Sequence, residues 1–525
     1  MEAVSTEKAR KILGYMKPPA EPWAEVPGEK ITVHAAVSRV AVFYETLRNA
    51  IDYKDEHLLR KAALLRILKR RLAFSDDPKN IALYLIKELI AARYLPNGAV
   101  PEMLVDVTAQ IIQKFQVLRK TGVGDERYFR WLIGLVGAEI EEALDERAHE
   151  RGLSVFLYEA LEDKITLKKN AALDDVERRL QIYVACLRLF LKADDDVVSY
   201  KLVRAYYSSW MRPEEWTDAR AMALQMLGVE RQVRHQLKHR FGQKFQAAVK
   251  PAAVALRLLV EALKKKPELA EKMLKNIESE LYPIVEAVAD ERLGAAKGKL
   301  RRGTVRAVIY LFITKMALAL CLEVPFETLL YKELDMTALA INISFPPVLM
   351  FIIGAMIRMP GPENVAKIKK LVSQLLSDSG LDSRDIKVPA RKSWWRRLIL
   401  QIVYVCTFGL TFGLVFSGLK RLNFTPVSSA IFIFFLCVVS FFAYRLRQTA
   451  REFVVVEKPE RFSTALGDLF FYPILRAGQF LSSSISRINI FLFFFDFLVE
   501  APFKLFLNAL ETWFAYMREK KEELQ

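Results

Sequence analysis

The most restrictive feature of this sequence is an uncharged run of 22 residues, 398–419, with the sequence LILQIVYVCTFGLTFGLVFSGL. At a rise of about 1.5 Å per residue, a helix of this length crosses the roughly 30 Å hydrocarbon core of a bilayer. Directly before the run stand Trp394, Trp395, Arg396 and Arg397. Tryptophans followed by arginines are typical of a cytoplasmic membrane interface. The run therefore predicts a transmembrane helix, with these four residues as its interfacial anchors.

A second uncharged run, residues 427–444, begins only seven residues after the first one ends. The short connection predicts that the two runs form an antiparallel helical hairpin. In the first helix Gly409, Gly413 and Ser417 repeat every four residues and form a ridge of small side chains. Such ridges allow another helix to approach closely in lipid. The sequence leaves open whether that helix comes from this chain or from a second copy.

Two segments further upstream are weaker candidates for membrane spans. Residues 307–322 contain strongly apolar side chains worth about −4 kcal/mol in total at mid-membrane, whereas Lys315 costs about 2.5–3.5 kcal/mol there. Residues 338–357 carry Asn342 and the pair Pro346 and Pro347. Each segment alone is a marginal span. We expect them to insert together as a hairpin whose polar groups face inward.

Lys315 is the residue that this pattern singles out for function. Ionisable residues inside a membrane usually face a bundle interior or a water path, and they often pair. Together with Asn342, Pro346 and Pro347, Lys315 is a candidate for an ion path or gate. The alternative is a structural lysine that reaches the interface or a backbone carbonyl. Glu323 follows two helical turns later, and we expect it on a similar face but too far away for direct contact.

The charges predict how the chain is oriented. The sequence has 78 Lys and Arg against 61 Asp and Glu, and residues before Val305 are dense in both signs, as a soluble surface requires. The segment 358–397 has ten basic and four acidic residues, whereas 323–337 has one basic and four acidic. The positive-inside rule places the N-terminal part and 358–397 in the cytoplasm. Lys420 and Arg421, in the predicted hairpin turn, are an exception.

The part before the membrane segments is predicted to be helical. A segment 1–30 with a proline-rich spacer (Pro18, Pro19, Pro22, Pro27) precedes an all-α domain, 31–304, in which apolar residues recur three or four apart. Helix breaks are predicted at 75–78, 95–98, 121–124 and 212–215, where proline, glycine and aspartate gather. Within 58–72 the pattern predicts one apolar face, made of Leu59, Ala62, Leu65 (with Leu64) and Leu68.

The C-terminal segment, 451–525, predicts an amphipathic helix. Its polar residues recur along one narrow stripe of the helix: Asn489, Asp496, Glu500, Lys504, Asn508 and Glu511. At 100° per residue the stripe covers about 120° and leaves the rest of the helix apolar. We expect this helix to lie on the membrane surface. A buried or spanning helix is the alternative.

No motif predicts catalysis, a cofactor or a metal. His235 and His239 have the spacing of helical zinc ligands, but Gln236 stands where a metalloprotease needs its glutamate, and basic residues surround the pair. We interpret this segment as a basic helix face that can touch anionic lipid. Asp194 stands where a helix N-cap belongs. The four scattered cysteines predict buried thiols and not a disulfide framework.

Taken together, these patterns predict an all-α protein. A large cytosolic helical domain precedes a polytopic membrane domain, 305–450, and the amphipathic C-terminal segment. We expect the protein in the cytoplasmic (inner or plasma) membrane, with both termini on the cytosolic side. The leading hypothesis for function is a membrane-anchored scaffold or assembly factor. The alternative is a transporter or channel component, and the third is a membrane-bound enzyme without a recognisable motif. The expected partners are the bilayer with its anionic headgroups, an unknown protein on the cytosolic domain, and a second copy of the chain. Nucleic acid is disfavoured, because the basic patches lack interleaved aromatic residues.

Overall fold

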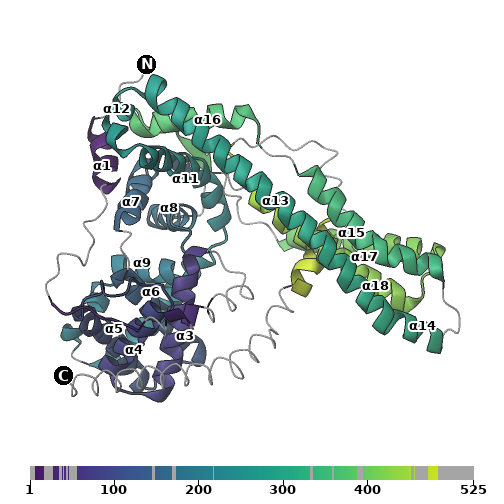
Figure 1. Cartoon of the computed structure of the whole chain (residues 1–525), viewed down its shortest axis with the longest axis horizontal. Helices are drawn as coiled ribbons and strands as arrows, with labels where there is room; N and C mark the ends of the chain where they lie inside the picture. The colour runs from purple at the N-terminus through teal and green to yellow at the C-terminus, as the bar shows by residue number, and fades with distance from the viewer. Residues whose placement is uncertain are drawn as a thin grey trace, which may run out of the picture.

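The computed structural model describes residues 6–16, 28–34, 38–39, 41–42, 45, 56–144, 148–167, 173–216, 218–330, 335–357, 360–386, 394–450, 454–455 and 471–482. These residues are predominantly helical, as the sequence predicts. They form two helical lobes and an apolar arm that extends away from them (Figure 1). The proline-rich spacer and the predicted C-terminal polar stripe lie outside the described residues.

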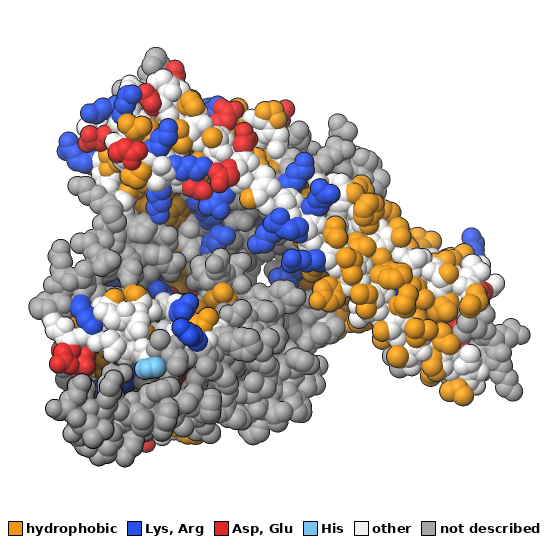
Figure 2. Space-filling model, viewed as in Figure 1, with side chains coloured by type: hydrophobic (Ala, Val, Ile, Leu, Met, Phe, Trp, Pro, Cys, Tyr) orange, Lys and Arg blue, Asp and Glu red, His pale blue; other side chains and the backbone are white. Residues whose placement is uncertain are grey.

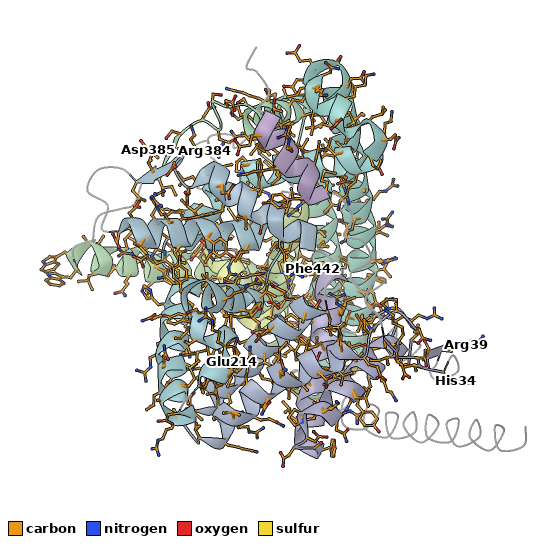
Figure 3. All side chains as sticks on the ribbon, turned by 90° about the vertical axis from the view of Figure 1, so that its left-hand side faces the viewer. His34, Arg39, Glu214, Arg384, Asp385 and Phe442 are labelled. Carbon is orange, nitrogen blue, oxygen red and sulfur yellow. The ribbon has the colours of Figure 1, made fainter. Side chains whose placement is uncertain are left out.

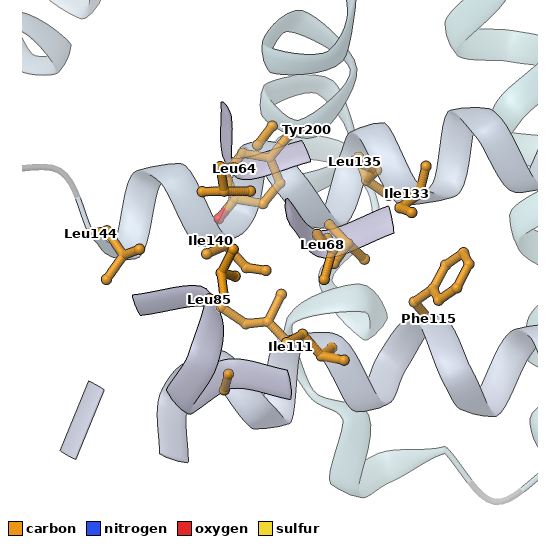
Figure 4. Close-up of a cluster of buried hydrophobic side chains, with 14 of the residues drawn as sticks. Leu64, Leu68, Leu85, Ile111, Phe115, Ile133, Leu135, Ile140, Leu144 and Tyr200 are labelled. Atoms are coloured by element: carbon orange, nitrogen blue, oxygen red, sulfur yellow. The ribbon is translucent and has the colours of Figure 1, made fainter. Parts of the chain in front are cut away.

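The first lobe is built from helices that close around one large apolar core. Part of that core is drawn in Figure 4, where Leu68, Leu85 and Ile111 meet from three different helices. The predicted breaks at 75–78, 95–98, 121–124 and 212–215 all fall between helices of this lobe or in its short helical turns. These helices are α3 (Glu56–Phe74), α4 (Pro78–Ala91), α5 (Met103–Lys120), α6 (Glu126–Ala143), α9 (Asp195–Tyr206), η1 (Ser208–Met211), η2 (Pro213–Glu215) and α10 (Ala219–Leu237).

The buried face of α3 differs from the predicted one. Leu64 and Leu68 are buried as expected, but Leu59, Ala62 and Leu65 are only half-buried. The buried positions also include Lys61, whose ammonium lies 2.5 Å from Asp194 Oδ1 and 3.0 Å from Asp196 Oδ2. Because these aspartates come from α9, the ion pairs that turn Lys61 inward cannot be predicted from the periodicity of α3. Asp194 is also the N-cap of α9, as predicted, and accepts from the Val197 backbone N–H.

The second lobe has its own core and shares α8 with the first. Val184 and Leu187 of α8 lie in the first core, whereas Ile182 and Cys186 lie in the second. Its elements are α1 (Thr6–Met16), α7 (Ala148–Leu161), β1 (Ile165–Leu167), α8 (Asp175–Phe190), α11 (Gly242–Lys265), η3 (Pro267–Leu269), α12 (Ala270–Lys275), η4 (Ile277–Leu281), α16 (Pro362–Leu376) and β2 (Arg384–Ile386).

Two elements of the second lobe come from the segment that follows the second apolar helix. The helix α16 buries Ile368 and Leu371 in the core of this lobe. The strand β2 pairs in parallel with β1, with Thr166 opposite Asp385, and the Arg384 guanidinium donates to the backbone carbonyl of Ala248 at 3.0 Å (Figure 3). Within the segment between the second and third predicted spans, α16 and β2 are therefore part of the second lobe. Three-residue strands are too short to be recognised by alternation, so the sequence did not reveal this pairing.

One helix connects the second lobe to the arm without a break. The helix α13 (Tyr282–Leu318) buries Val285 and Val288 in the second core and Lys315 in the arm. The helix is regular through residues 301–305, where the composition changes from charged to apolar. The π-helical turn η5 (Ala319–Glu323) and α14 (Val324–Leu330) continue it to the far end of the arm (Figure 1).

The arm contains four helices that are long and apolar enough to cross a membrane: Ile277–Leu329, Met336–Met356, Leu398–Arg421 and Pro426–Arg447. They contain or nearly match the four predicted spans. The last three belong to α15 (Met336–Met356), α17 (Trp394–Arg421) and α18 (Pro426–Ala450). Apolar side chains cover the visible face of the arm, in contrast to the mixed charges of the second lobe (Figure 2).

A further helical segment, residues 471–482, packs on the arm. Ile474 is buried against α18 in the same cluster as Phe432 and Cys437. Gly478 makes the closest approach, because a Cβ atom at this position would overlap the backbone carbonyl oxygen of Cys437. The glycine is therefore required for close packing of this segment on α18.

Candidate functional site

A cluster of buried polar side chains lies inside the apolar arm. Lys315, Glu323 and Asn342 have no exposed surface, and Glu327 and Ser428 are 4% and 1% exposed. Three separate stretches of helix contribute them: the α13–η5–α14 rod, α15, and the first turn of α18. Buried polar groups in an apolar arm are costly unless they satisfy each other. We call these five residues, together with Thr425, the polar cluster.

Lys315 and Glu323 form an ion pair, which corrects the expectation that they lie too far apart. The Lys315 Nζ is 3.7 Å from Glu323 Oε2. Glu323 is the last residue of the π-helical turn η5, and the wider winding of this turn changes the phase and shortens the rise between the two side chains. Two long side chains can then meet although their positions are eight residues apart. The Lys315 ammonium also lies 4.8 Å from the centre of the Phe435 ring.

The carboxylates accept hydrogen bonds from α15 and α18. The Asn342 amide and the Ser428 hydroxyl both donate to Glu323 Oε1. The Ser428 hydroxyl also lies 2.9 Å from Glu327 Oε1, and the Thr425 hydroxyl lies 2.9 Å from the same oxygen. The acidic residues therefore connect the α13–η5–α14 rod to both neighbouring helices.

Within the described part of the chain, three buried atoms of the cluster have no hydrogen-bond partner: Lys315 Nζ, Glu323 Oε2 and Asn342 Oδ1. Most buried polar atoms in proteins are hydrogen-bonded, so unsatisfied ones are often found at functional positions. The ion pair between Lys315 and Glu323 is longer than a hydrogen bond and leaves both groups with unused capacity. The cluster is thus closed to solvent, but its hydrogen-bonding capacity is not fully used.

The proline pair lies beside the cluster, as the sequence suggested. Pro346 and Pro347 are buried inside α15, which continues through them as helix. A proline has no backbone N–H, so the carbonyls four residues earlier lose their helical partners. For Pro346 that carbonyl belongs to Asn342. The prolines therefore loosen the backbone of α15 at the residue that binds Glu323.

The sequence identified two of the six residues of the polar cluster, and it noted Glu323 but placed it out of reach of Lys315. Lys315 and Asn342 were predicted, whereas Glu327, Thr425 and Ser428 were not. Glu327 was assigned with Glu323 to a connecting loop, but helix continues as far as Leu330 and buries both carboxylates. The available signal was weak: Thr425 and Ser428 begin an apolar helix, where hydroxyl residues also serve as caps.

Exposed basic residues surround the base of the arm, where it meets the second lobe (Figure 2). An added Cβ at Gly303 on α13 would lie 3.4 Å from Leu446 on α18, so the basic middle stretch of α13 and the basic end of α18 lie side by side. We call this set the basic collar: Lys297, Lys299, Arg301, Arg302, Arg306, Arg445 and Arg447.

The predicted anchors and the predicted ridge are both on α17. Trp394 and Trp395 are 62% and 57% exposed at its first turn, with stacked rings; the side chains of Arg396 and Arg397 lie outside the description. Gly409, Gly413 and Ser417 are exposed, and nothing among the described residues lies within 4 Å of a Cβ added to either glycine. The described part of the chain therefore does not supply the helix that the ridge would receive.

The two lobes contain two further polar features. His239 is nearly buried with its Nε2 3.4 Å from Glu177 Oε1, and burial lowers the pKa of His239. Among the described residues, no group of three or more potential ligands is placed to hold a metal ion. A pocket in the first lobe is lined by Ser38, Arg39, Ile90, Arg93, Tyr94, Leu95, Pro96 and Asn97. Among the described residues that line it there is no carboxylate and no histidine.

Comparisons with family models, with curated proteins and with solved structures found no match for this chain. The function therefore has to be argued from the residues and the geometry described above.

Proposed function

We propose that this chain is an integral membrane protein that acts as a scaffold and holds a partner complex at the bilayer through its two soluble lobes. One observation carries the proposal: α13 is a single helix of 37 residues that belongs to the second core at one end and to the apolar arm at the other. A continuous helix fixes both the distance and the angle between two bodies, whereas a flexible linker fixes neither. Such a connection suits a protein whose lobes must be presented at a defined height above a membrane.

The orientation that we propose puts both lobes in the cytoplasm. The basic collar supports this orientation, because Lys and Arg concentrate on the cytoplasmic side of membrane helices and attract anionic headgroups. The exposed tryptophans Trp394 and Trp395 at the first turn of α17 suit the interface. We expect alkaline carbonate to leave the chain in the membrane. Protease added outside intact cells should leave the lobes undigested.

The scaffold proposal is tested by isolating the full chain with its surrounding lipid after chemical cross-linking. We expect one protein at fixed stoichiometry, with cross-links that map to the soluble lobes. A chain recovered alone and monodisperse would contradict the proposal.

A matched pair of variants examines the rigid connection. Gly298 lies in α13 next to the basic collar, and Gly298→Pro removes one helical hydrogen bond and kinks the helix, whereas Gly298→Ala keeps it straight. Electron microscopy should show a changed angle between lobes and arm in the first variant only. If the partner is held at the same angle to the arm in G298P as in the wild type, the rigid helix does not set its position, and this part of the proposal is wrong.

A second candidate function, a transporter or channel component, is favoured by the polar cluster. Lys315 and Glu323 are buried toward the far end of the α13–η5–α14 rod, and Asn342 is buried in α15; we propose that both helices cross the membrane. Reconstituted vesicles loaded with a pH-sensitive or cation-sensitive dye test it. Ion movement that Lys315→Met abolishes would favour transport, and vesicles that stay tight with the wild-type chain would oppose it.

Three further hypotheses, on a surface helix, on pairing of two copies and on enzyme activity, rest on the sequence alone. The surface helix with the stripe Asp496, Glu500, Lys504, Asn508 and Glu511 and the pairing of two copies through α17 are proposals that complete the membrane architecture. The enzyme hypothesis has no described group of residues in its favour.

A further inference from the structure

The polar cluster contains more negative than positive groups. Glu323 and Glu327 are two carboxylates, and Lys315 is the one cation among the described side chains that contact them. The neighbours on the other packed elements are neutral: Asn342 on α15, and Thr425 and Ser428 on α18. Asp335, at the start of α15, is further along the chain and accepts from the backbone N–H groups of Thr337 and Ala338. With every group ionised, the cluster would hold a net charge of −1 in an apolar arm.

A net charge at this position is expensive. The cost of an unpaired buried charge is several kcal/mol, and it grows where lipid replaces water around the protein. One additional proton would make the cluster neutral.

The hydrogen bonds of Ser428 indicate where that proton lies. The Ser428 oxygen is within hydrogen-bond distance of one carboxylate oxygen of Glu323 and one of Glu327. A serine hydroxyl has a single hydrogen, so it can donate to only one of the two. The other oxygen must donate to Ser428, which a carboxylic acid can do and a carboxylate cannot.

Thr425 does not remove this requirement. Its hydroxyl donates to Glu327 Oε1 and accepts from the Ser428 backbone N–H at 3.2 Å, so its one hydrogen is already used. The contact between Ser428 and the second carboxyl group therefore still needs a proton of its own.

We propose that Glu323 and Glu327 share one proton through the Ser428 hydroxyl, and that the polar cluster is a proton-binding site inside the apolar arm. Lys315 then balances the single remaining negative charge. The unpartnered atoms Lys315 Nζ and Glu323 Oε2 are the second observation: both are fully buried, they face each other at 3.7 Å, and they leave the cluster able to adopt a second hydrogen-bonding pattern when the proton departs. This inference does not depend on what the soluble lobes hold.

The test uses the purified full chain in lipid nanodiscs and infrared difference spectroscopy between neutral and alkaline pH. A protonated carboxyl group has a carbonyl stretch that a carboxylate lacks, and we expect the wild-type chain to lose this band as the pH rises. Glu327→Gln should remove the band, because a glutamine amide cannot titrate but can still donate to Ser428. Glu323→Gln is the second variant, and Glu268→Gln, at an exposed position of the second lobe, is the control that should leave the band unchanged.

Thermal unfolding provides an independent readout. The proton is bound in the folded state, so wild-type stability should be greatest at low pH and decrease as the pH rises through the titration of the pair. The stability of E327Q should not show this decrease, whereas that of E268Q should follow the wild type.

Three results would overturn the proposal. The first is a wild-type chain without a protonated carboxyl band at neutral pH. The second is a band that persists unchanged in both E327Q and E323Q. The third is a stabilisation of the wild type by sodium chloride, abolished in E327Q and without any carboxyl band, since that outcome would assign the site to a metal cation. None of these results depends on whether a partner complex is recovered, so they are distinguishable from a failure of the scaffold proposal.

Discussion

The ion pair between Lys114 and Glu139 in the first lobe allows a quantitative test of how this lobe is held together. The Lys114 Nζ is 2.6 Å from Glu139 Oε1, and both side chains are about 95% buried. The Trp210 indole N–H donates to the other carboxylate oxygen at 2.9 Å, and the Lys114 ammonium lies 5.1 Å from the Trp210 ring centre. One pair thus connects α5, α6 and the turn η1.

Removal of one charge should be far more costly than removal of both. Glu139→Gln leaves a buried ammonium without a counter-ion, and breaking a buried pair in this way costs about 3–5 kcal/mol. The double variant K114M/E139Q keeps similar volumes and removes both charges, so it should lie within about 1 kcal/mol of the wild type. At roughly 2–4 °C per kcal/mol for a lobe of this size, E139Q should unfold about 6 °C or more below the wild type.

The single variant Lys114→Met should behave differently from E139Q, because its remaining group can lose its charge. Burial raises the pKa of Glu139, and Lys114 is the main group that lowers it. Without Lys114 the folded state binds the Glu139 proton more tightly than the unfolded state does. The stability of K114M should therefore be greatest at low pH and decrease as the pH rises through the folded-state titration.

The assay is thermal unfolding of the full chain in nanodiscs, followed by tryptophan fluorescence and by hydrogen exchange of α5 and α6. A double variant as unstable as E139Q would refute the reasoning, because it would show that the lost stability comes from packing and not from the unpaired charge. A single variant E139Q as stable as the wild type would refute it equally.

Three further predictions concern caps, packing and pH. Asp194→Ala and Asp194→Asn both lose the ion pair with Lys61, but the asparagine amide oxygen can still cap α9; D194A should therefore be less stable than D194N by about 1–2 kcal/mol, which chemical unfolding of both variants measures. Gly478→Ala should lower the melting temperature of the arm, because its Cβ would overlap the backbone of α18, and Gly413→Ala should not, because nothing described lies within 4 Å of its Cβ. Burial lowers the pKa of His239, so the contribution of this residue to stability should be present above about 6.5, the ordinary histidine value, and be lost as the pH falls below it. Melting curves across pH should show this loss in the wild type and in His235→Gln but not in His239→Gln, and an identical loss in both variants would contradict the assignment.

The sequence predicted the parts of this fold that depend on local pattern. The four apolar helices follow from composition, the break at 75–78 from its turn residues, and the cap at Asp194 from helix-end chemistry. Each of these signals depends only on residues that are close together in the sequence. The buried face of α3 was predicted only in part, because Lys61 is turned inward by aspartates more than 130 residues away.

The candidate site was predicted to the same degree. Lys315 and Asn342 are conspicuous because they are polar within apolar runs. Glu323 and Glu327 are not, since an acidic residue at the end of an apolar run has the same pattern whether it lies in a loop or in a buried helix. The π-helical turn that brings Glu323 to Lys315 has no signature in the sequence, and neither has the approach of Ser428 from a helix a hundred residues later.

The return of α16 and β2 to the second lobe has a consequence for how the chain is made. The core of this lobe stays open until residues near 386 have left the ribosome, and by then both helices of the first apolar hairpin have been synthesised. In the membrane orientation that we propose, insertion of that hairpin would come before the lobe can close, and the closed lobe would then hold α16 and β2 on its own side of the membrane. Closure of the second lobe would thus fix the membrane topology of the chain. A chain truncated before α16 would leave α11 with an uncovered apolar face and become a substrate for quality control.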